Sequence, residues 1–532
     1  MPRGTAVLPL LLAVALALGA ACSDEDLVGL GKQPHDVGAA IEAATPIEAI
    51  ATSTPDPAAE AVDWSTANGD LRNTRARVGG IDRSNVAALE VAWEHSLRGV
   101  GPYGAAAGAP VVVDGVVYAQ DLASNVYAVD LEDGTTLWTH VNGVPISGPN
   151  GPAVADGRVF SSVGVARFEA LDAASGEELW SIDLDRDGFQ PSVAGDTVYV
   201  GVGAFSLVGG NSGKLYALDA ASGAIRWVFQ VVEDGFWGDP TLNAGGGVWY
   251  PPAIDEERGL VMLGTGNPGP YPGTRDFPNA TSRPGPNLYT SSLVALDAES
   301  GELEWYFQAV EHDLFDHDLQ LSPVLASIPR ADGPRDVVIA AGKVGRVYAL
   351  DADSGEVLWQ TAVGRHLNDN LEELPLGQLI EVYPGIYGGV ETPMAVANGL
   401  VFVPVVNIPT YHSATGHGAA DGSSALLNAA TSSGFSGGSG ELVVLDVASG
   451  RVVWQRTFDR PNFGGATAIG DLVFTATYDG TIYAFRQTDG ELLWTYEAGG
   501  GINAWPAIEG DTLIWPIGLG PRPRLIAFRP AS

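Results

Sequence analysis

Short stretches of alternating apolar and polar residues run through most of this chain, and turn-forming residues separate them. Residues 215–218 (Leu-Tyr-Ala-Leu) are typical, because the turn sequence DAASG follows at 219–223 and a second apolar stretch contains Trp227. Alternation with a period of two predicts β-strands, and Asp, Ser and Gly at fixed positions predict a tight turn. The chain is therefore expected to be built from β-hairpins.

The same nine-residue phrase recurs seven times, with Asp first, Gly fifth and Trp ninth; Arg486 replaces Asp in the last copy. The copies end at Trp138, Trp180, Trp227, Trp305, Trp359, Trp454 and Trp494. A hairpin precedes each copy, and an eighth hairpin near Gly510 is followed by residues 524–528 without a Trp strand. Residues 89–93 supply that missing strand. We therefore predict an all-β fold, an eight-bladed β-propeller of four-stranded blades closed by pairing N- and C-terminal strands.

Two intervals between successive tryptophans are longer than the rest. Trp227 and Trp305 are 78 residues apart and Trp359 and Trp454 are 95 apart, against 40 to 54 elsewhere. Extra length in a propeller goes into loops at the ends of the ring, where binding sites are built. Residues 412–440, rich in Gly, Ser and Ala, are expected to form a lid, with the histidines at 412 and 417 exposed to solvent.

Residues 1–22 predict an export signal, because Arg3 precedes an apolar stretch that is too short to span a membrane. Cys22 is the single cysteine of the chain and follows Gly-Ala-Ala, as in the lipobox of bacterial lipoproteins. We expect a lipid anchor on Cys22, with a plain cleaved signal as the alternative. Residues 23–62, rich in Ala, Pro and acidic residues, predict a disordered tether, and residues 63–532 form the predicted propeller domain.

The charge is strongly negative, with 27 basic and 64 acidic residues and a net charge of −37. Such a charge argues against nucleic-acid or anionic-membrane binding. Acidic exported proteins carry it without any partner, and a basic protein partner is the alternative. A single cysteine excludes an intrachain disulfide and a C-x-x-C-H haem attachment. Three of the basic residues are lysines, at 32, 214 and 343, so a lysine stands out in this chain.

Residues 63–75, DWSTANGDLRNTR, resemble the opening of the PQQ-dependent (pyrroloquinoline quinone) alcohol and sugar dehydrogenases, and the Trp phrase resembles their propeller repeat. The resemblance covers about residues 63 to 530. It marks the fold more strongly than the activity, because the same repeat builds non-catalytic propellers, including an outer-membrane assembly lipoprotein. The active site has to be argued from its own residues.

The first long interval contains GGGVW at 245–249 and GTGNP at 264–268. By the resemblance, Trp249 forms the floor under the quinone and Asn267 ligates the metal. A flat tricyclic quinone needs an aromatic platform, and a hard cation on its carbonyl needs oxygen ligands. The alternatives are that Trp249 is a core aromatic and that Asn267 is a turn residue.

The segment EHDLFDHD at 311–318 resembles the HDLWDxD segment of the family. Asp316 falls on the catalytic aspartate, the general base that takes the substrate hydroxyl proton, and is a metal ligand too. Asp318 matches a position that supplies an extra carboxylate in lanthanide-type enzymes. Lys343 aligns with the Lys or Arg that contacts the quinone oxygens. The alternatives are a solvated acidic loop for the two carboxylates and an exposed strand end for the lysine.

Glu391, Asn407 and Phe463 fall where the family lines its cofactor pocket. Several positions depart from the family. Ala107 and Gly151 replace a Glu and an Arg that contact the quinone, Val208 lies where a metal-ligating Glu is expected, and the vicinal disulfide over the quinone is absent. These departures put metal affinity and cofactor retention in question.

Two functions of different classes follow. The first is a PQQ-dependent dehydrogenase, with Ca²⁺ or a lanthanide, that oxidises an alcohol or sugar hydroxyl outside the cytoplasm. Because no haem motif is present, the electrons would pass to a separate acceptor, a basic cytochrome c or a membrane quinone. The alternative is a cofactor-free PQQ-like propeller lipoprotein that acts as a binding or assembly scaffold. In both cases the protein is exported and attached to the cell envelope by its lipid anchor, on the periplasmic or extracellular face.

The lipid anchor gives the first prediction. Cys22→Ser should convert a protein that pellets with membranes into a soluble exported one, because an acylated Cys22 would be its hydrophobic attachment. Fractionation of cells expressing each form, followed by a salt wash of the membranes, measures the outcome. A variant that still resists the salt wash would contradict the assignment.

Overall fold

The repeated phrase forms a capped turn. In the copy at 219–223, Asp219 Oδ1 accepts hydrogen bonds from the backbone N–H and the hydroxyl of Ser222, at 2.9 and 2.7 Å. Gly223 has φ +74°, a conformation that glycine adopts without steric cost, and its N–H donates to the Asp219 carbonyl. The phrase therefore joins strands β13 (Lys214–Asp219) and β14 (Ile225–Gln230).

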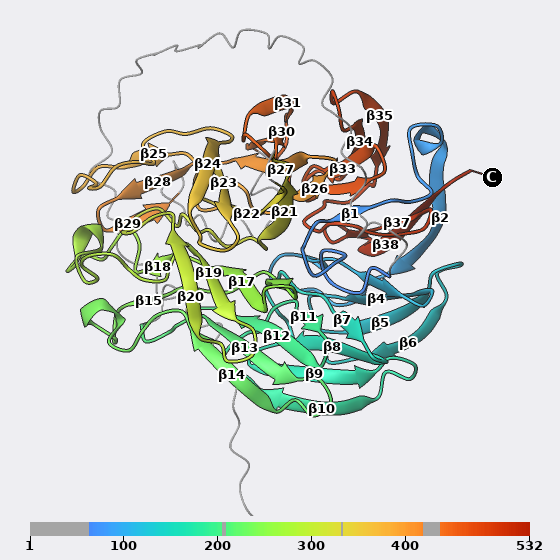
Figure 1. Ribbon diagram of the computed structural model, residues 1–532, viewed down its shortest axis with the longest axis horizontal. Coiled ribbons are helices and arrows are strands. Elements are labelled where there is room, and N and C mark those ends of the chain that lie inside the picture. Colours follow the sequence, from blue (N-terminus) through green and yellow to red (C-terminus); the bar gives the residue numbers. More distant parts are fainter. Residues whose placement is uncertain (1–62, 205–208, 331–332, 419–436, 532) are drawn as a thin grey trace, which may run out of the picture. The chain divides into compact units, whose positions relative to one another are not determined.

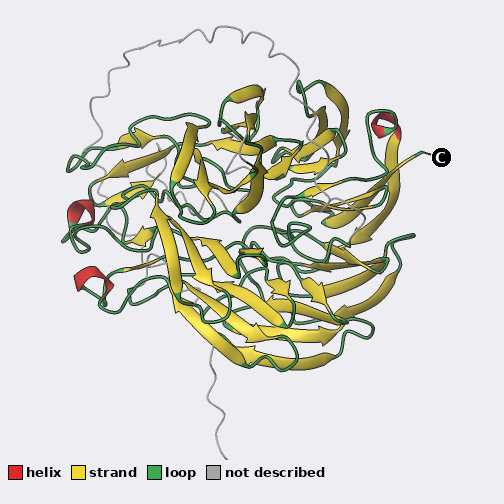
Figure 2. Ribbon diagram, in the orientation of Figure 1, coloured by secondary structure: helices red, strands yellow, loops and turns green. Residues whose placement is uncertain are grey.

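The computed structural model describes residues 63–204, 209–330, 333–418 and 437–531, which lie in the compact unit Ser53–Ser532. Strands dominate, and the helical elements of these ranges are three 3-10 turns: η2 (Val86–Ala88), η3 (Phe236–Gly238) and η4 (Pro278–Ala280) (Figure 2). The predicted signal, tether and lipidated Cys22, and the position of Val208, lie outside the described residues.

Eight sheets, each with four antiparallel strands, form the blades, which we number from the one that contains β3; the seventh gains the short parallel strand β1 (Ala76–Arg77) as a fifth. Blade 1 is β3 (Val111–Val113), β4 (Val116–Gln120), β5 (Val126–Asp130) and β6 (Thr136–His140). Blade 2 is β7 (Ala153–Ala155), β8 (Arg158–Val163), β9 (Arg167–Asp172) and β10 (Glu178–Asp183). Blade 3 is β11 (Ser192–Ala194), β12 (Thr197–Val202), β13 and β14. Blade 4 is β16 (Ala253–Asp255), β17 (Leu260–Gly264), β19 (Ser292–Asp297) and β20 (Leu303–Gln308).

The other four blades repeat this order of strands. Blade 5 is β21 (Val324–Ile328), β22 (Arg335–Ala341), β23 (Arg346–Asp351) and β24 (Val357–Ala362). Blade 6 is β26 (Ala395–Ala397), β27 (Leu400–Asn407), β30 (Ser439–Asp446) and β31 (Val452–Phe458). Blade 7 is β32 (Thr467–Ile469), β33 (Leu472–Ala476), β34 (Thr481–Arg486) and β35 (Leu492–Glu497). Blade 8 is β36 (Ala507–Glu509), β37 (Thr512–Ile517), β38 (Arg524–Pro530) and β2 (Leu89–Ser96). The predicted all-β propeller of eight four-stranded blades is confirmed.

Blade 8 joins the two ends of the described chain. Strand β2 pairs antiparallel with β38, with Trp93 opposite Ala527, so the N-terminal strand supplies the outer edge of a C-terminal sheet. In Figure 1 the blue β2 lies beside the red β37 and β38. This pairing confirms the predicted closure, and it covers the sheet edge that the last hairpin would otherwise expose.

Residues 64–75, which we call the inner belt, hydrogen-bond to the first strand of six blades. Backbone carbonyls of the belt accept from the N–H at the second residue of each strand, at 2.8 to 3.0 Å. The donors are Val112, Val154, Ile254, Leu325, Val396 and Ala468 in blades 1, 2, 4, 5, 6 and 7. The belt therefore ties the inner strands together at the centre of the ring.

Arg75 anchors the end of the belt. Its fully buried guanidinium donates to the carbonyls of Ala466 and Pro506, at 2.9 and 2.7 Å, next to the inner strands of blades 7 and 8. The guanidinium of Arg77 lies over the Trp64 ring, 4.9 Å from its centroid, in a cation–π contact. Strand β1 (Ala76–Arg77) then pairs with β32. The sequence that resembles a family opening is thus the segment that closes the centre of the ring.

At seven of the eight joints between blades, the tryptophan of one blade packs on the phrase glycine of the next blade. These tryptophans are Trp93, Trp138, Trp180, Trp227, Trp305, Trp359 and Trp454, whereas Trp494 of blade 7 meets no phrase glycine. A Cβ placed on Gly355 would lie 2.5 Å from the Trp305 ring, and equivalent contacts of 2.5 to 2.8 Å join the other pairs. Six of these indoles donate from Nε1 to a backbone carbonyl of the next blade: Trp93, Trp138, Trp180, Trp227, Trp359 and Trp454. Successive blades are therefore joined by one repeated contact.

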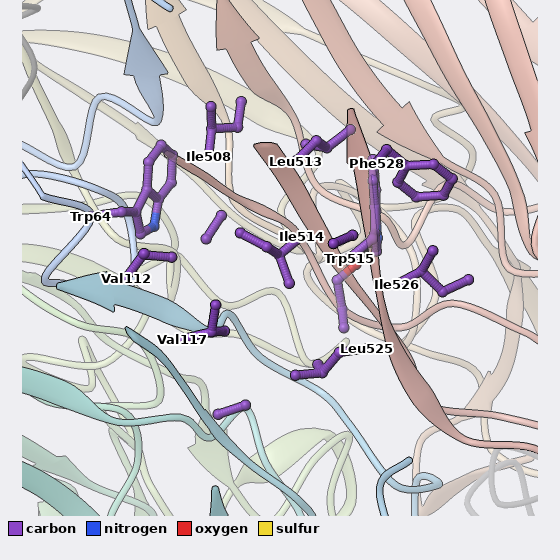
Figure 3. Packing of buried hydrophobic residues seen from close by; sticks show 14 of the residues in the cluster. Trp64, Val112, Val117, Ile508, Leu513, Ile514, Trp515, Leu525, Ile526 and Phe528 are labelled. Atoms are coloured by element: carbon purple, nitrogen blue, oxygen red, sulfur yellow. Dashed lines mark hydrogen bonds between the residues drawn. The ribbon is translucent and has the colours of Figure 1, made fainter. Parts of the chain in front are cut away.

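The largest hydrophobic cluster lies where blade 8 meets its neighbours. Trp64 of the belt and Val112 and Val117 of blade 1 pack in the same cluster as Trp515 and Phe528 of blade 8 (Figure 3). Trp64 and Trp515 are both fully buried. The joint between the chain ends is therefore sealed by packing as well as by strand pairing.

The two long intervals add small sheets to the propeller. Strands β15 (Ala244–Gly245) and β18 (Pro268–Gly269) pair within the first. Strands β25 (Ile380–Val382), β28 (Thr410–Ser413) and β29 (Gly416–Gly418) form a sheet within the second. In the described ranges, no helix has the length and apolar character that a membrane crossing requires.

The tryptophan contact gives a stability prediction. Gly355→Ala should lower the free energy of unfolding by about 2–4 kcal/mol, because the new methyl group meets the Trp305 ring in addition to the cost of φ +71°. Gly115→Ala is the matched control, since Gly115 has φ +75° but nothing lies within 4 Å of the position that a methyl group would take, and should cost only about 1 kcal/mol. Denaturant unfolding measures both. Equal losses would show that the contact contributes nothing.

Candidate active site

A cavity of about 300 Å³ opens at the N-terminal ends of the inner strands. Its walls come from residues that immediately precede those strands and from the loops that follow the second strand of blades 3, 4 and 5. The lining includes Tyr103, Ala107, Asp187, Phe189, Trp249, Tyr250, Asn267, Tyr271, Asp316, Lys343, Ile386, Tyr387, Glu391, Phe463, Asn503 and Trp505. Every blade contributes to this one site, so it exists only in the closed ring.

Trp249 presents its ring to the cavity because three glycines precede it. The N–H of Gly246 donates to the Asn267 carbonyl and that of Gly266 to the Gly247 carbonyl, which pairs the two glycine-rich segments. A Cβ on Gly247 would lie 2.0 Å from Trp249 Nε1, so only glycine leaves room for the indole. The ammonium of Lys343 lies 4.7 Å from the centroid of the Trp249 ring, in a cation–π contact.

Lys343 also binds two carboxylates of the segment 311–318, those of Asp316 and Asp318. Its Nζ lies 2.8 Å from Asp316 Oδ2 and 2.9 Å from Asp318 Oδ2, and all three side chains are buried. The backbone N–H of Asn267 donates to the other oxygen of Asp318. The structure thus brings together five of the residues predicted from the sequence: Trp249, Asn267, Asp316, Asp318 and Lys343.

Asp313 builds the turn that carries Asp316. Its carboxylate accepts from the N–H groups of Phe315 and His317, each at 2.8 Å. Asp316 itself has φ +68°, a left-handed conformation that is costly for a side chain with a Cβ. The Asp313 carboxylate is therefore structural, and it holds Asp316 in a strained geometry at the cavity wall.

Burial shifts the ionisation of this cluster. Desolvation raises the pKa of Asp316 well above its ordinary value, although the Lys343 ammonium acts in the opposite direction, and it raises the pKa of Asp318 in the same way. Burial alone would lower the pKa of Lys343, but the carboxylates of Asp316, Asp318 and Glu391 outweigh burial and hold it well above its ordinary value. Lys343 is therefore a cation whose charge the carboxylates require.

Glu391 and Phe463 also line the cavity. Burial raises the pKa of Glu391 to about 8, and its Oε1 is buried without a hydrogen-bond partner. Asn407, in contrast, is not part of the cavity wall. Its Oδ1 accepts from the N–H of Arg365 and its Nδ2 donates to Glu441, both at 2.8 Å. The contact of Asn407 with a cofactor stays a prediction that this geometry does not support.

The described residues do not complete a metal site. Ca²⁺ takes roughly six to eight oxygen ligands, whereas Lys343 already binds one oxygen of Asp316 and one of Asp318. Asn267 directs its Nδ2 to the Pro268 carbonyl, at 3.1 Å. Within the described ranges, no group of three or more His, Cys, Asp or Glu side chains gathers as ligands. Metal ligation by Asn267, Asp316 and Asp318 therefore stays a prediction.

The expectation that His412 is solvated is wrong. His412 lies on β28 with no exposed surface, packed edge-on against Phe315 with ring centroids 5.3 Å apart. His417 stacks on Tyr271, a cavity residue, with centroids 5.2 Å apart and an interplanar angle of 2°. Burial lowers the pKa of both rings, that of His417 to about 4. The inserted sheet is thus held against the cavity wall by neutral histidines, while residues 419–436 of the predicted lid lie outside the described ranges.

Two family models match the chain. One, described as "Glucose/ethanol/alcohol dehydrogenase, beta-propeller domain", matches residues 64–150 and 188–365. The other, described as "Outer membrane protein assembly factor BamB", matches residues 123–204 and 409–532. Quinohemoprotein alcohol dehydrogenase of Comamonas testosteroni is 27% identical over 66% of this chain, and quinoprotein alcohol dehydrogenase PedH of Pseudomonas putida is 28% identical over 74%. The chain is a distant relative of the PQQ-dependent alcohol dehydrogenases and shares their β-propeller.

The relatives differ in how much of their length is matched. The chain spans 56% of the Comamonas protein and 75% of PedH. Among solved structures, the quinohemoprotein alcohol dehydrogenase ADHIIG of Pseudomonas putida superposes with a TM-score of 0.76, at 24% identity over 88% of this chain and 80% of that one. A europium-containing methanol dehydrogenase superposes with a TM-score of 0.73, at 20% identity over 88% and 98% of the two chains. These likenesses show the shared fold.

Sequence analysis missed several cavity residues of this PQQ-family propeller. Tyr250 and Trp505 stack with ring centroids 5.9 Å apart, and the hydroxyls of Tyr103 and Tyr387 interact across the cavity wall. Phe189, Tyr250 and Trp505 stand two or three residues before an inner strand. Three of the predicted wall residues, Trp249, Glu391 and Phe463, stand four residues before an inner strand, so a search of the residues just before each inner strand could have identified the others.

The buried lysine gives a pH-dependent stability prediction. Lys343→Met should lower the free energy of unfolding at pH 8 by about 3–5 kcal/mol, because it leaves two buried carboxylates without their cation. Both carboxylates have raised pKa values, and the variant loses stability as pH rises and they ionise, so the loss should shrink towards pH 5. Denaturant unfolding at both pH values measures this change. Lys214→Met, which removes a surface pair with Asp185, should cost at most about 1 kcal/mol at either pH; a similar loss in both variants would contradict the prediction.

Proposed function

We propose that this protein is a PQQ-dependent dehydrogenase that oxidises the hydroxyl group of an alcohol or a sugar. The proposal rests on one observation: Trp249, Lys343 and Asp316 meet in a single cavity, with an aromatic face, a buried cation and a buried base. Together they supply a platform, a countercharge and a proton acceptor.

The cavity fits a flat aromatic cofactor. Trp249 offers a half-buried ring face, and Lys343 stands beside it where the oxygens of an ortho-quinone would need a positive charge. The Oε1 of Glu391 and the Nε1 of Trp505 are buried without a hydrogen-bond partner, so polar groups remain for a ligand. When bound, PQQ supplies the two-electron acceptor that none of the twenty side chains can provide.

Asp316 is the group that moves the substrate proton. Its carboxylate lies on the cavity wall, and the strained turn held by Asp313 keeps it there. Lys343 favours the ionised form that can accept a proton, while burial favours the neutral form. Because burial raises the pKa of Asp316, the activity should rise with pH through a range above that of an ordinary aspartate.

The net charge bears on the electron acceptor, the cavity volume on the substrate, and the leader sequence on the location of the protein. A net charge of −37 suits a basic cytochrome c as electron acceptor, and a membrane quinone is the alternative. A small alcohol or sugar suits a cavity of about 300 Å³ that also receives the cofactor. We place the protein outside the cytoplasm, tethered to the envelope through Cys22.

A second candidate is a cofactor-free scaffold with the same ring. One observation favours it: among the described residues that line the cavity, Lys343 is the sole cation, whereas PQQ carries three carboxylates. The match to the BamB model over 123–204 and 409–532 agrees with this alternative. The two functions separate on whether the purified protein binds PQQ.

The general base gives the decisive prediction. Purified protein with PQQ and either Ca²⁺ or La³⁺ should show the absorption band of the bound quinone and reduce an artificial dye in the presence of an alcohol or a sugar. Asp316→Asn should keep PQQ bound while lowering turnover by about 10²-fold or more. Trp249→Ala should instead weaken PQQ binding by about tenfold, since the stacking surface is lost.

The control for Asp316 is Glu311→Gln, which removes an exposed carboxylate from the same segment and should leave turnover unchanged. If the wild-type protein binds no PQQ with either metal and reduces no dye, the dehydrogenase proposal fails and the scaffold takes its place. If Asp316→Asn keeps its turnover, the proton is taken by another group.

A further inference from the structure

The cavity has an unusual balance of charge for a site that receives an anion. Its described wall carries three carboxyl groups, those of Asp187, Asp316 and Glu391, and one cation, Lys343. That cation is already bound to Asp316 and Asp318. If the proposed function is correct, the ligand brings three further carboxylates. An ionised Glu391 would then add to a repulsion that a low-dielectric site screens poorly.

Glu391 is held at the cavity by its backbone. The N–H of Gly389 donates to the Val406 carbonyl at 2.9 Å, and that of Val390 donates to the Gly342 carbonyl at 3.0 Å, next to Lys343. The hydroxyl of Tyr250 donates to the backbone carbonyl of Glu391. These bonds tie the segment to blades 4, 5 and 6 and leave its side chain to border the cavity.

The carboxyl group of Glu391 has an oxygen that the protein leaves unused. Oε1 is buried and has no hydrogen-bond partner in the described structure. An unpaired buried polar atom of this kind costs free energy unless a ligand or a water satisfies it. Glu391 is also one of the residues that line the cavity, so a ligand bound there lies next to this carboxyl group.

The charged groups around Glu391 act in opposite directions. Burial raises its pKa to about 8, the Lys343 ammonium lowers it, and the Asp318 carboxylate raises it further. Asp316 shares Lys343 with Asp318 and so weakens the lysine's influence on Glu391. At neutral pH the group is protonated, and a protonated carboxyl is a hydrogen-bond donor, which a carboxylate is not.

We propose that Glu391 meets the cofactor as a neutral carboxylic acid and donates a hydrogen bond to one of its oxygen atoms. The inference rests on the proposed function and adds a consequence to it. Above neutral pH the free protein must take up a proton before it binds the tricarboxylate. Cofactor affinity and proton uptake are therefore linked through this one residue.

The test measures PQQ binding rather than turnover. Titration calorimetry of the wild-type protein with PQQ, at a fixed Ca²⁺ concentration, should give an affinity about tenfold weaker at pH 9 than at pH 7, as expected for one group that ionises near pH 8. Repeating it at pH 9 in buffers of different ionisation enthalpy should give an uptake of about one proton per PQQ.

Glu391→Gln keeps the shape and the donor but cannot ionise. It should bind PQQ with nearly the same affinity at pH 7 and pH 9 and take up almost no proton. Glu381→Gln is the matched control, because Glu381 lies on the same insertion and accepts from the Tyr411 hydroxyl at 3.0 Å, away from the cavity wall. It should keep the wild-type pH profile.

The outcomes separate the inference from the proposed function. A wild-type protein that binds no PQQ at pH 6, 7 or 9 overturns both. A protein that binds PQQ with a flat pH profile, or a Glu391→Gln variant that keeps the wild-type slope and proton uptake, overturns the role of Glu391 alone. Near-ultraviolet circular dichroism of both variants shows whether the fold is retained, and a misfolded Glu391→Gln is replaced by Glu391→Asn under the same criteria.

Discussion

The contact between a tryptophan of one blade and a glycine of the next is the interaction on which the rest of this structure depends. Blades are small sheets that cannot bury enough surface alone, and the indole both fills the space over the glycine and, in most copies, donates to the neighbouring backbone. The contact recurs at seven of the eight joints, so successive blades pack on one another in the same way around the ring.

Closure then has to be secured at the centre and at the joint between the chain ends. The inner belt hydrogen-bonds to six inner strands, and Arg75 satisfies carbonyls beside two of them. With the belt bonded to the second residue of each of these six strands, the open space lies at the N-terminal ends of the inner strands. That is where residues distant in sequence, from Tyr103 to Trp505, form one cavity.

The chemistry of that cavity is governed by Lys343. One ammonium faces the Trp249 ring and two buried carboxylates, and no other described wall residue carries a positive charge. Removing one partner of a buried ion pair leaves an uncompensated charge, so a ligand that enters the cavity has to leave the pairing of Lys343 with its carboxylates in place or replace it. Burial raises the pKa values of Asp316 and Glu391, and the neutral forms that burial favours reduce the negative charge around Lys343.

Local patterns in the sequence were sufficient to predict the repeat, the blade count and the closure through β2 and β38, because each depends on a periodicity that the blades repeat. The meeting of Trp249 with the Asn267 and Asp316 segments was implied by the resemblance of these segments to a known family. The burial of His412, the position of Asn407 outside the wall, and the surroundings of Glu391 were decided only by the tertiary structure. The positions of these residues depend on how the inserted segments pack across blades. The pKa shift of Glu391 depends on desolvation, and desolvation is caused by neighbours that the fold brings in from elsewhere in the chain, so the order of residues does not reveal it.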